Sequence, residues 1–204
     1  MSLILKRQIG ASGIAASSVG LGTWAIGGWM WGGTDDAASE DAIRAGLDEG
    51  ITLIDTAPAY GLGHAEEVVG RAIKGRRDEV VLATKCGLVW HAQRGPYFFA
   101  QDGLPVHRDL SPEAIRHEVD QSLRRLGTDR IDLYITHWQD PTTPIAETVG
   151  ALKSLQAEGK ILAFAASNTT AEDLAAYRAE GGIAAVQEEY SMLTRRIEQT
   201  HLPV

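Results

Sequence analysis

The chain has 204 residues, 44% hydrophobic and 23% charged, which is enough apolar side chain to form the core of a globular domain. Its formal net charge of −8 argues against nucleic acid as a partner, and no basic run reverses that balance. The single cysteine, Cys86, cannot form an internal disulfide, and no apolar run approaches the about 18 residues of a membrane helix. The N-terminal stretch turns polar too soon for a signal peptide, so we expect a soluble, cytoplasmic protein.

Short apolar runs alternate with helical patterns along the chain. A first segment, residues 4–16, contains Gly10 and Gly13 and resembles a small hairpin. The apolar runs predicted as strands are 17–22, 51–55, 79–85, 131–137, 161–167 and 184–190. The segments predicted as helices between them are 39–49, 64–74, 111–126, 145–158 and 170–179.

Capping signals support these helices. Residues that suit a helix N-terminus are Ser39, Ser111 followed by Pro112 and Glu113, and Thr170 with Asp173 three positions later. Glycines that suit the ends of helices are Gly50, Gly127, Gly159 and Gly181.

The predicted strands are apolar throughout rather than alternating, which is typical of parallel strands covered by helices. Repeated strand–helix units leave two architectures: an open doubly wound sheet, or a (β/α)8 TIM barrel preceded by a hairpin. Six such strands are present, whereas a closed barrel needs eight. No linker or low-complexity segment divides the chain.

The longest interruption is the segment 85–112, between the third predicted strand and its helix. Loops of this length in compact domains are often functional. This one brings Trp90, Tyr97, Phe98 and Phe99 close together in sequence. It is either a hydrophobic flap over its own end of the barrel or a wall of a substrate pocket.

Polar side chains stand where consecutive strands end. They are Asp55, Thr84 with Lys85, Thr136 with His137, Ser167 with Asn168, and Gln187. In a barrel of parallel strands these ends converge on the face that carries the chemistry. Each residue alone has a structural explanation, but their recurrence on five consecutive strands indicates a site.

Four of the candidate side chains would suit proton delivery to a carbonyl oxygen while another group supplies a hydride. They are Asp55, Tyr60, Lys85 and His137. A phenol with the ordinary pKa near 10 is a poor proton shuttle at neutral pH, but a neighbouring ammonium stabilises the phenolate and a carboxylate holds that ammonium. A neutral imidazole beside the phenol could orient the carbonyl. Side chains suited to hold a carboxamide, such as that of nicotinamide, are Ser167, Asn168 and Gln187.

Several longer motifs occur in the same order as in a known family. They are GLGTW (20–24), LIDTAPAYG (53–61), ATK (83–85), RRLGTDRIDLYITHWQDP (124–141), EGKILAFAASN (158–168) and QEEYSMLTRRIE (187–198). On these motifs the chain resembles the aldo-keto reductases, NAD(P)H-dependent enzymes built on a (β/α)8 barrel. It is most similar to the bacterial branch that contains general stress and inositol-utilisation reductases. The segment AFAASN departs from the family's usual IGVSN but keeps the Ser–Asn pair.

The resemblance implies a role for each matching residue. Tyr60 would be the general acid, Asp55 and Lys85 would tune it, and His137 would orient the carbonyl. Residues implied near the cofactor are Gly22, Thr23, Trp24, Asp55, Ser167, Asn168 and Gln187. Residues implied near the substrate, an aldehyde, ketone or sugar, are Trp24, Trp90, His137 and Trp138.

The resemblance also implies one reductase-like barrel domain over residues 1–204 that stops before the seventh strand. In the family, the region that follows carries the aromatic residue that stacks on nicotinamide and the basic residues that hold the adenosine 2′-phosphate. We expect NADPH in preference to NADH.

The sequence also allows three rival interpretations. GLGTWA (20–25) fits a dinucleotide-binding fingerprint, but a glycine- and tryptophan-rich loop follows it instead of a helix, and Asp55 lies too far along the chain. The histidines show no metal-ligand spacing. A non-catalytic, cofactor-binding or regulatory protein with the same fold stays open, although such a protein has no need of a proton donor.

Overall fold

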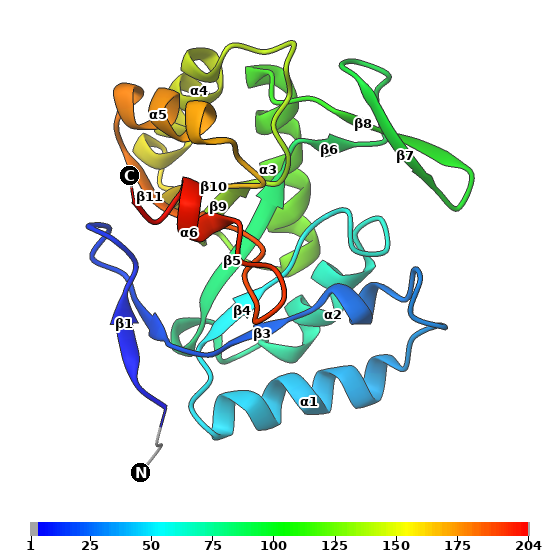
Figure 1. Ribbon diagram of the computed structural model, residues 1–204. Helices are drawn as coiled ribbons and strands as arrows, with labels where there is room; N and C mark the ends of the chain where they lie inside the picture. The colour runs from blue at the N-terminus through cyan, green and yellow to red at the C-terminus, as the bar shows by residue number, and fades with distance from the viewer. Residues whose placement is uncertain (1–3, 204) are drawn as a thin grey trace.

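The computed structural model describes residues 4–203, so residues 1–3 and 204 of the expected domain lie outside the described range. Its centre is a curled sheet of six parallel strands (Figure 1). The strands are β3 (Gly20–Gly22), β4 (Leu53–Asp55), β5 (Val81–Cys86), β9 (Ile131–Thr136), β10 (Ile161–Ser167) and β11 (Ile183–Gln187). Each strand pairs in parallel with the next one along the chain, which is the arrangement of a partial (β/α)8 barrel.

Helices follow the strands and cover the outer face of the sheet (Figure 1). They are α1 (Asp36–Asp48), α2 (His64–Ala72), α3 (Pro112–Leu126), α4 (Ile145–Ala157) and α5 (Ala171–Glu180). Each of these helices packs on its neighbour in sequence. Shorter helical turns are η1 (Trp24–Gly27), η2 (Arg77–Glu79) and α6 (Ile197–Thr200). No helix within residues 4–203 is long and apolar enough to span a bilayer.

Two of the predicted helix starts are confirmed. The Ser111 hydroxyl accepts a hydrogen bond from the Ala114 backbone N–H, and Thr170 forms a capping box with Asp173. The prediction that Ser39 begins the first helix is wrong. That helix begins three residues earlier, because the carboxylate of Asp35 accepts from the Ala38 N–H.

The predicted strand 17–22 is in fact divided between two sheets. Its first residue belongs to β2 (Ala15–Ser17), which pairs antiparallel with β1 (Lys6–Gln8) and confirms the expected hairpin. Only Gly20–Gly22 joins the barrel sheet. Ser17 makes the connection, because its hydroxyl oxygen accepts from the backbone N–H groups of Thr52 and Leu53.

The two faces of the sheet bury different clusters. Outward-facing Tyr134 and Phe164 of the sheet pack under the helices, in one fully buried cluster with Tyr177 of α5. The inward face carries small and aliphatic side chains from β4, β5, β9, β10 and β11. Ile9 and Ile14 of the hairpin pack against this inner cluster, so the hairpin closes the end of the barrel opposite the strand C-termini.

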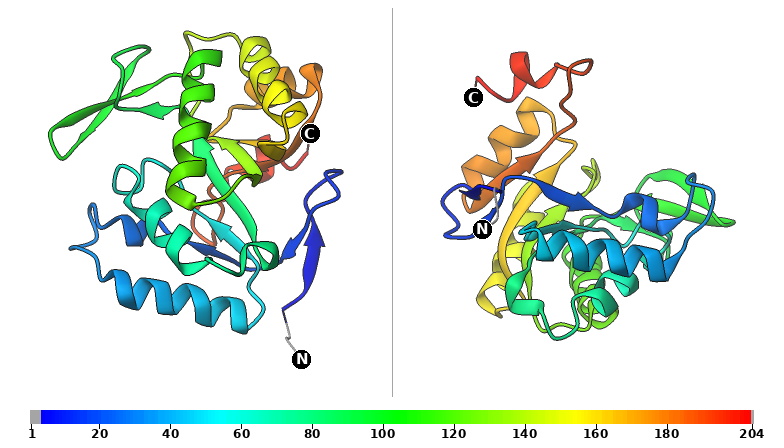
Figure 2. Two further views of the ribbon diagram at one scale, coloured as in Figure 1. Left: turned by 180° about the vertical axis from the view of Figure 1, so that it is seen from behind. Right: turned by 90° about the horizontal axis from the view of Figure 1, so that it is seen from below.

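The segment 85–112 contains an antiparallel sheet that was not predicted. Its strands are β6 (Leu88–Val89), β7 (Tyr97–Gln101) and β8 (Leu104–Arg108), with β8 in the middle. Asp102 and Gly103, with φ of 51° and 80°, join β7 to β8. An Asp-Gly pair with two positive φ angles is a preferred hairpin turn, so the sequence did carry this signal. We call residues 88–108 the flap; it lies on the opposite side of the molecule from the N-terminal hairpin (Figure 2).

Candidate active site

The sheet brings the predicted acid–base residues together at the C-terminal ends of three adjacent strands. Asp55 ends β4, Lys85 lies next to the end of β5, and His137 follows β9. The parallel register places Asp55 opposite Ala83 and Lys85 opposite Ile135. Tyr60 comes from the loop after β4, and its ring meets the His137 ring edge-on at 5.7 Å between centroids.

The Lys85 ammonium is held by three acceptors. Its Nζ lies 2.6 Å from Asp55 Oδ1, 3.0 Å from the Thr56 carbonyl oxygen and 3.0 Å from the Tyr60 hydroxyl oxygen. An ammonium has three N–H donors, so this set uses all of them. The side chain is only 2% exposed. Burial lowers the pKa of Lys85, but the charge of Asp55 and the phenol of Tyr60 outweigh burial and raise it overall.

This contact orients the phenol. Because the Tyr60 oxygen accepts from Lys85, its own O–H is left to point elsewhere, and Tyr60 lines a cavity together with His137. Burial, and next the charge of Lys85, hold the pKa of His137 well below its usual range. The imidazole is therefore neutral at pH 7 and can donate one N–H.

The backbone of the Tyr60 loop is fixed by close packing. A Cβ on Gly27 would lie 2.5 Å from the Tyr60 carbonyl carbon, so only glycine allows this approach. Gly61 has φ of 69° and faces the Gly27 carbonyl. Thr23, which is fully buried, donates from its hydroxyl to the Asp55 carbonyl oxygen at 3.1 Å. The phenol is therefore carried by a rigid loop.

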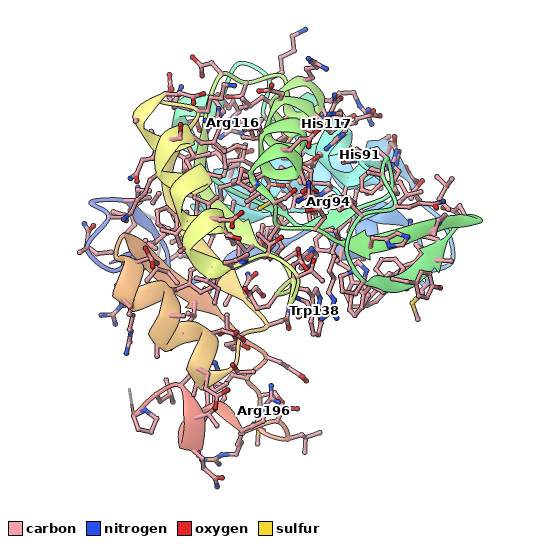
Figure 3. The ribbon with its side chains drawn as sticks, turned by 90° about the horizontal axis from the view of Figure 1, so that it is seen from above. His91, Arg94, Arg116, His117, Trp138 and Arg196 are labelled. Atoms are coloured by element: carbon pink, nitrogen blue, oxygen red, sulfur yellow. The ribbon has the colours of Figure 1, made fainter. Side chains whose placement is uncertain are left out.

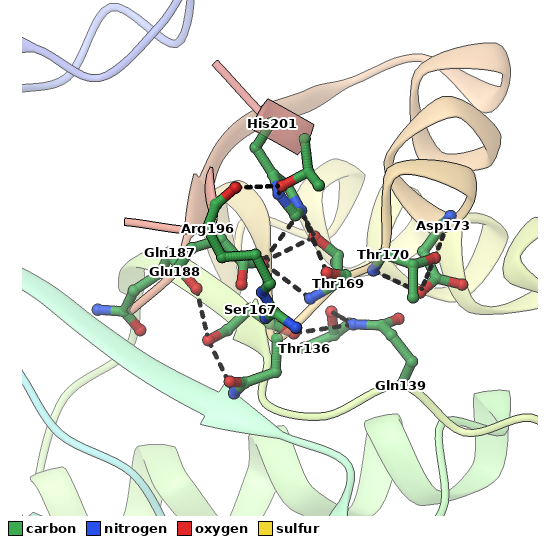
Figure 4. A network of polar contacts seen from close by, with 12 residues as sticks. Thr136, Gln139, Ser167, Thr169, Thr170, Asp173, Gln187, Glu188, Arg196 and His201 are labelled. Carbon is green, nitrogen blue, oxygen red and sulfur yellow. Dashed lines mark hydrogen bonds and ion pairs between the residues drawn. The ribbon is translucent and has the colours of Figure 1, made fainter. Parts of the chain in front are cut away.

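The three residues expected to hold a carboxamide contact the acid–base set or one another. Two of them, Ser167 and Gln187, lie together in the polar network of Figure 4. Gln187 donates its amide N–H to Asp55 Oδ2 at 3.1 Å, and the Ser167 hydroxyl donates to the Gln187 carbonyl oxygen at 2.8 Å. Asn168 has φ of 54° and donates its amide to the His137 carbonyl oxygen at 2.8 Å. Gln139 supports the end of β10 by donating to the Ser167 carbonyl oxygen.

These amide and hydroxyl groups fit a nicotinamide carboxamide. Asn168 lines the cavity with Tyr60 and His137, and Gln187 contacts the same carboxylate as Lys85. A carboxamide offers one acceptor and two donors, which side-chain amides and hydroxyls can match. Gly22 and Trp24 lie at the end of the neighbouring strand β3, where Trp24 reaches the cavity.

The cavity above Tyr60 has a volume of about 320 Å³ and is mainly aromatic. Its polar groups are those of Tyr60, His137 and Asn168. The remaining walls come from the β3 loop, the Tyr60 loop, the flap and the residue after His137: Trp24, Trp29, Ala59, Leu88, Phe98, Phe99 and Trp138. Trp29 stacks on Phe99 at 5.1 Å between centroids, and Phe98 packs against Trp138 at 5.1 Å.

Trp90 does not reach this cavity. It packs with the cluster of Ala59, Leu88 and Val106 and lines a separate depression with His91 and His117. Figure 3 shows these two histidines together at α3, away from Trp138. Sequence reasoning did not single out Trp29, whose position in a Gly- and Trp-rich loop after the first barrel strand was the available signal.

Comparisons with known proteins agree with this fold. The profile of the Aldo/keto reductase family matches residues 18–204. Aldo-keto reductase YhdN of Bacillus subtilis is 48% identical over 83% of this chain and 49% of its own length. The NADH-specific methylglyoxal reductase of Escherichia coli is 46% identical over 76% of this chain and 48% of its own.

Two solved structures show the same architecture. Glycerol dehydrogenase AKR11B4 of Gluconobacter oxydans superposes with a TM-score of 0.85 at 44% identity, covering 100% of this chain and 60% of its own. An aldo/keto reductase of Klebsiella pneumoniae in complex with NADP and acetate gives a TM-score of 0.78 at 36% identity, covering 98% of this chain and 64% of its own.

The chain belongs to the aldo/keto reductase family. It spans about half the length of the curated relatives that it matches.

Proposed function

We propose that the protein reduces an aldehyde, ketone or sugar carbonyl to an alcohol with NAD(P)H, reversibly, with Tyr60 as the general acid. The observation that carries this proposal is the position of Lys85, whose three donors meet Asp55, Thr56 and Tyr60 in a buried site. Burying the Lys85 ammonium next to the Tyr60 phenol costs free energy, and a protein that only binds its ligand does not need this arrangement.

Proton transfer follows from the orientation of the phenol. The Tyr60 oxygen accepts from Lys85, so its proton is free to be donated toward a carbonyl oxygen in the cavity. The resulting phenolate would lie 3.0 Å from an ammonium, which stabilises it. In the reverse direction the same phenolate takes a proton from the alcohol.

His137 would orient the substrate rather than donate its proton. Its neutral imidazole can hydrogen-bond the carbonyl oxygen, and the edge-on contact with Tyr60 places both groups at one wall of the cavity. A neutral imidazole also avoids a second positive charge beside Lys85.

The cofactor supplies the hydride when it is bound. Ser167, Asn168 and Gln187 would hold its carboxamide, and Gly22, Thr23 and Trp24 would flank it. We propose NADPH over NADH, supported by the Klebsiella pneumoniae relative in complex with NADP. The Escherichia coli relative is described as NADH-specific, so comparing kcat/KM for the two cofactors tests this preference directly.

The substrate pocket is proposed to take its shape from aromatic side chains. Trp24 and Trp138 line the cavity, while Trp90 supports the base of the flap through Leu88 and Val106. The carbonyl would lie at the polar end beside Tyr60, His137 and Asn168.

A cytoplasmic location is proposed as well, because the only cysteine is buried and unpaired.

The decisive experiment mixes the protein with NADPH and a panel of aldehydes and follows nicotinamide absorbance. Oxidation that falls by about 10²-fold or more in Tyr60→Phe supports the assignment. Tyr190→Phe is the control, because the Tyr190 hydroxyl donates to Glu198 Oε1 at the surface, away from the cavity. Cofactor binding without turnover in the unsubstituted protein would favour the non-catalytic alternative.

A further inference from the structure

A carboxyl group outside the cavity contacts the backbone immediately after β5, the strand that carries Lys85. Glu118 lies on the inner face of α3, is 5% exposed, and accepts the Gly87 backbone N–H at 2.7 Å through Oε2. Its neighbours on the same face of the helix include Ile115 and Val119, which are fully buried. An acid at such a position is costly unless it satisfies a buried polar group, and the Gly87 N–H is that group.

Gly87 forms the junction at which β5 turns into the flap. Its φ is 92°, and a Cβ there would collide with the Leu110 side chain, so the turn has little freedom. The preceding residue, Cys86, accepts the backbone N–H of His137 on its carbonyl oxygen at 2.8 Å. A shift of this junction would therefore move the backbone of both Lys85 and His137.

A second buried acid contacts the strand on the other side of Lys85. Glu66, on α2, is fully buried and accepts the Thr84 hydroxyl at 2.6 Å. Its other oxygen accepts from Arg125 Nε at 2.7 Å. The residues before and after Lys85 are thus tied to the helix layer on the outer side of the sheet, while the Lys85 side chain contacts the active site.

We propose that Glu118 is a positioning residue, which fixes Lys85 and His137 by accepting the Gly87 N–H at the end of β5. This inference rests on the proposed function of Lys85 and His137. Glu118 itself lies outside the cavity that contains Tyr60 and touches none of the reacting groups.

The surroundings of Glu118 favour its neutral acid form, although the contact with Gly87 by itself favours the carboxylate. Burial raises the pKa of Glu118 to about 8, with the Gly87 N–H opposing that rise. The titratable groups that face it from α2, the loop before α3, α3, β5 and β9 are Glu66, Asp109, Arg125, Cys86 and Tyr134. A depression of about 270 Å³, lined also by His91 and His117, gives the carboxyl access to solvent protons.

Three variants test the proposal. Glu118→Gln keeps an acceptor oxygen at the same reach, Glu118→Leu removes it at similar volume, and Glu118→Asp shortens it by one methylene. Glu113→Gln is the control on the same helix, because the Glu113 side chain is 90% exposed. We expect kcat to fall about 10- to 100-fold in Glu118→Leu and Glu118→Asp, with KM for the carbonyl nearly unchanged, and to recover in Glu118→Gln.

A readout independent of turnover separates this inference from the proposed function. Gly87 amide exchange and the Lys85 side-chain NMR signal should both change in Glu118→Leu and Glu118→Asp and stay near wild type in Glu118→Gln. If Glu118→Leu does not fold, the same kinetic and NMR measurements on Glu118→Asp provide the test. An unchanged Lys85 signal and kcat, despite an exposed Gly87 amide, would overturn the positioning role. Turnover that persists in Tyr60→Phe would instead overturn the proposed function, while the NMR result would still stand.

Discussion

The Lys85 ammonium lies 2.6 Å from Asp55 Oδ1, and this pair is what permits a charge to be buried behind the Tyr60 phenol. Lys85 is 2% exposed, whereas Asp55 is 22% exposed and also accepts from Gln187. The Asp55 carboxylate therefore links Lys85, which contacts the proposed proton donor, to Gln187, which is proposed to hold the cofactor.

Replacing Asp55 should cost both stability and activity. In Asp55→Asn the buried ammonium loses its counter-charge, so we expect unfolding free energy to fall by about 2 kcal/mol and kcat by about 10²-fold. Denaturant unfolding and steady-state kinetics measure the two effects. Asp120→Asn is the matched control, because its pair with Lys160 is only partly buried and should be worth under about 1 kcal/mol. Equal effects in both variants would contradict the role of the buried pair.

Because Gly27 lies against the Tyr60 loop, we expect one added methyl group at this position to lower activity sharply. Gly27→Ala places a Cβ 2.5 Å from the Tyr60 carbonyl carbon, so the loop must move and kcat should fall by about 10²-fold. Gly150→Ala, within α4, meets no atom within 4 Å and should instead stabilise the protein by about 0.5–1 kcal/mol. Kinetics and thermal unfolding of both variants provide the test. Full activity in Gly27→Ala would show that the loop is not rigid.

The aromatic wall predicts selective effects on substrates. Phe99→Ala removes the ring that stacks on Trp29, so KM for bulky apolar aldehydes should rise by about tenfold while cofactor affinity changes little. The control is Tyr97→Ala, since Tyr97 is 60% exposed and does not line the cavity. A loss of cofactor affinity with unchanged substrate preference would count against the flap as a wall of the substrate pocket.

The burial of Glu118 predicts a dependence of stability on pH. Its pKa rises from the ordinary value of 4.5 to about 8, so the folded state holds a proton that the unfolded state releases. The contribution of the protonated Glu118 to the free energy of unfolding is fully present below about pH 4.5. It is lost as pH rises to about 8, with a slope of up to about 1.4 kcal/mol per pH unit. Unfolding free energies measured across this window should decline less steeply in Glu118→Gln than in Glu113→Gln. Parallel curves would show that Glu118 does not titrate in this range.

Local sequence signals identified most of the fold because they act over a few residues. Ser111 and Thr170 cap helices where their spacing to the following N–H groups predicts, and continuous apolar runs indicate strands buried on both faces. Where two local signals compete, the sequence is ambiguous. Asp35 and Ser39 can both cap a helix, and Asp35 does so.

Contacts between segments far apart in the chain could not be predicted from the sequence, for a different reason. The placement of Trp29 on Phe99, and of Trp90 outside the cavity, depends on how the flap folds back over the strand ends. The Glu118–Gly87 contact depends likewise on the packing of α3 against β5. No short-range pattern encodes these distances.

Residue types and their positions along the chain identify the groups that could do chemistry. Four of them lie at or just beyond the ends of parallel strands, which meet at one face: Asp55, Tyr60, Lys85 and His137. How those groups are used depends on packing in three dimensions. This packing places all three Lys85 donors on acceptors, so that the phenol proton faces the cavity, and it ties Thr84 and Gly87, on either side of Lys85, to buried acids. The reason is that strands and helices follow from patterns over a few neighbouring residues, whereas these hydrogen bonds require residues 18 or more positions apart to meet at fixed distances.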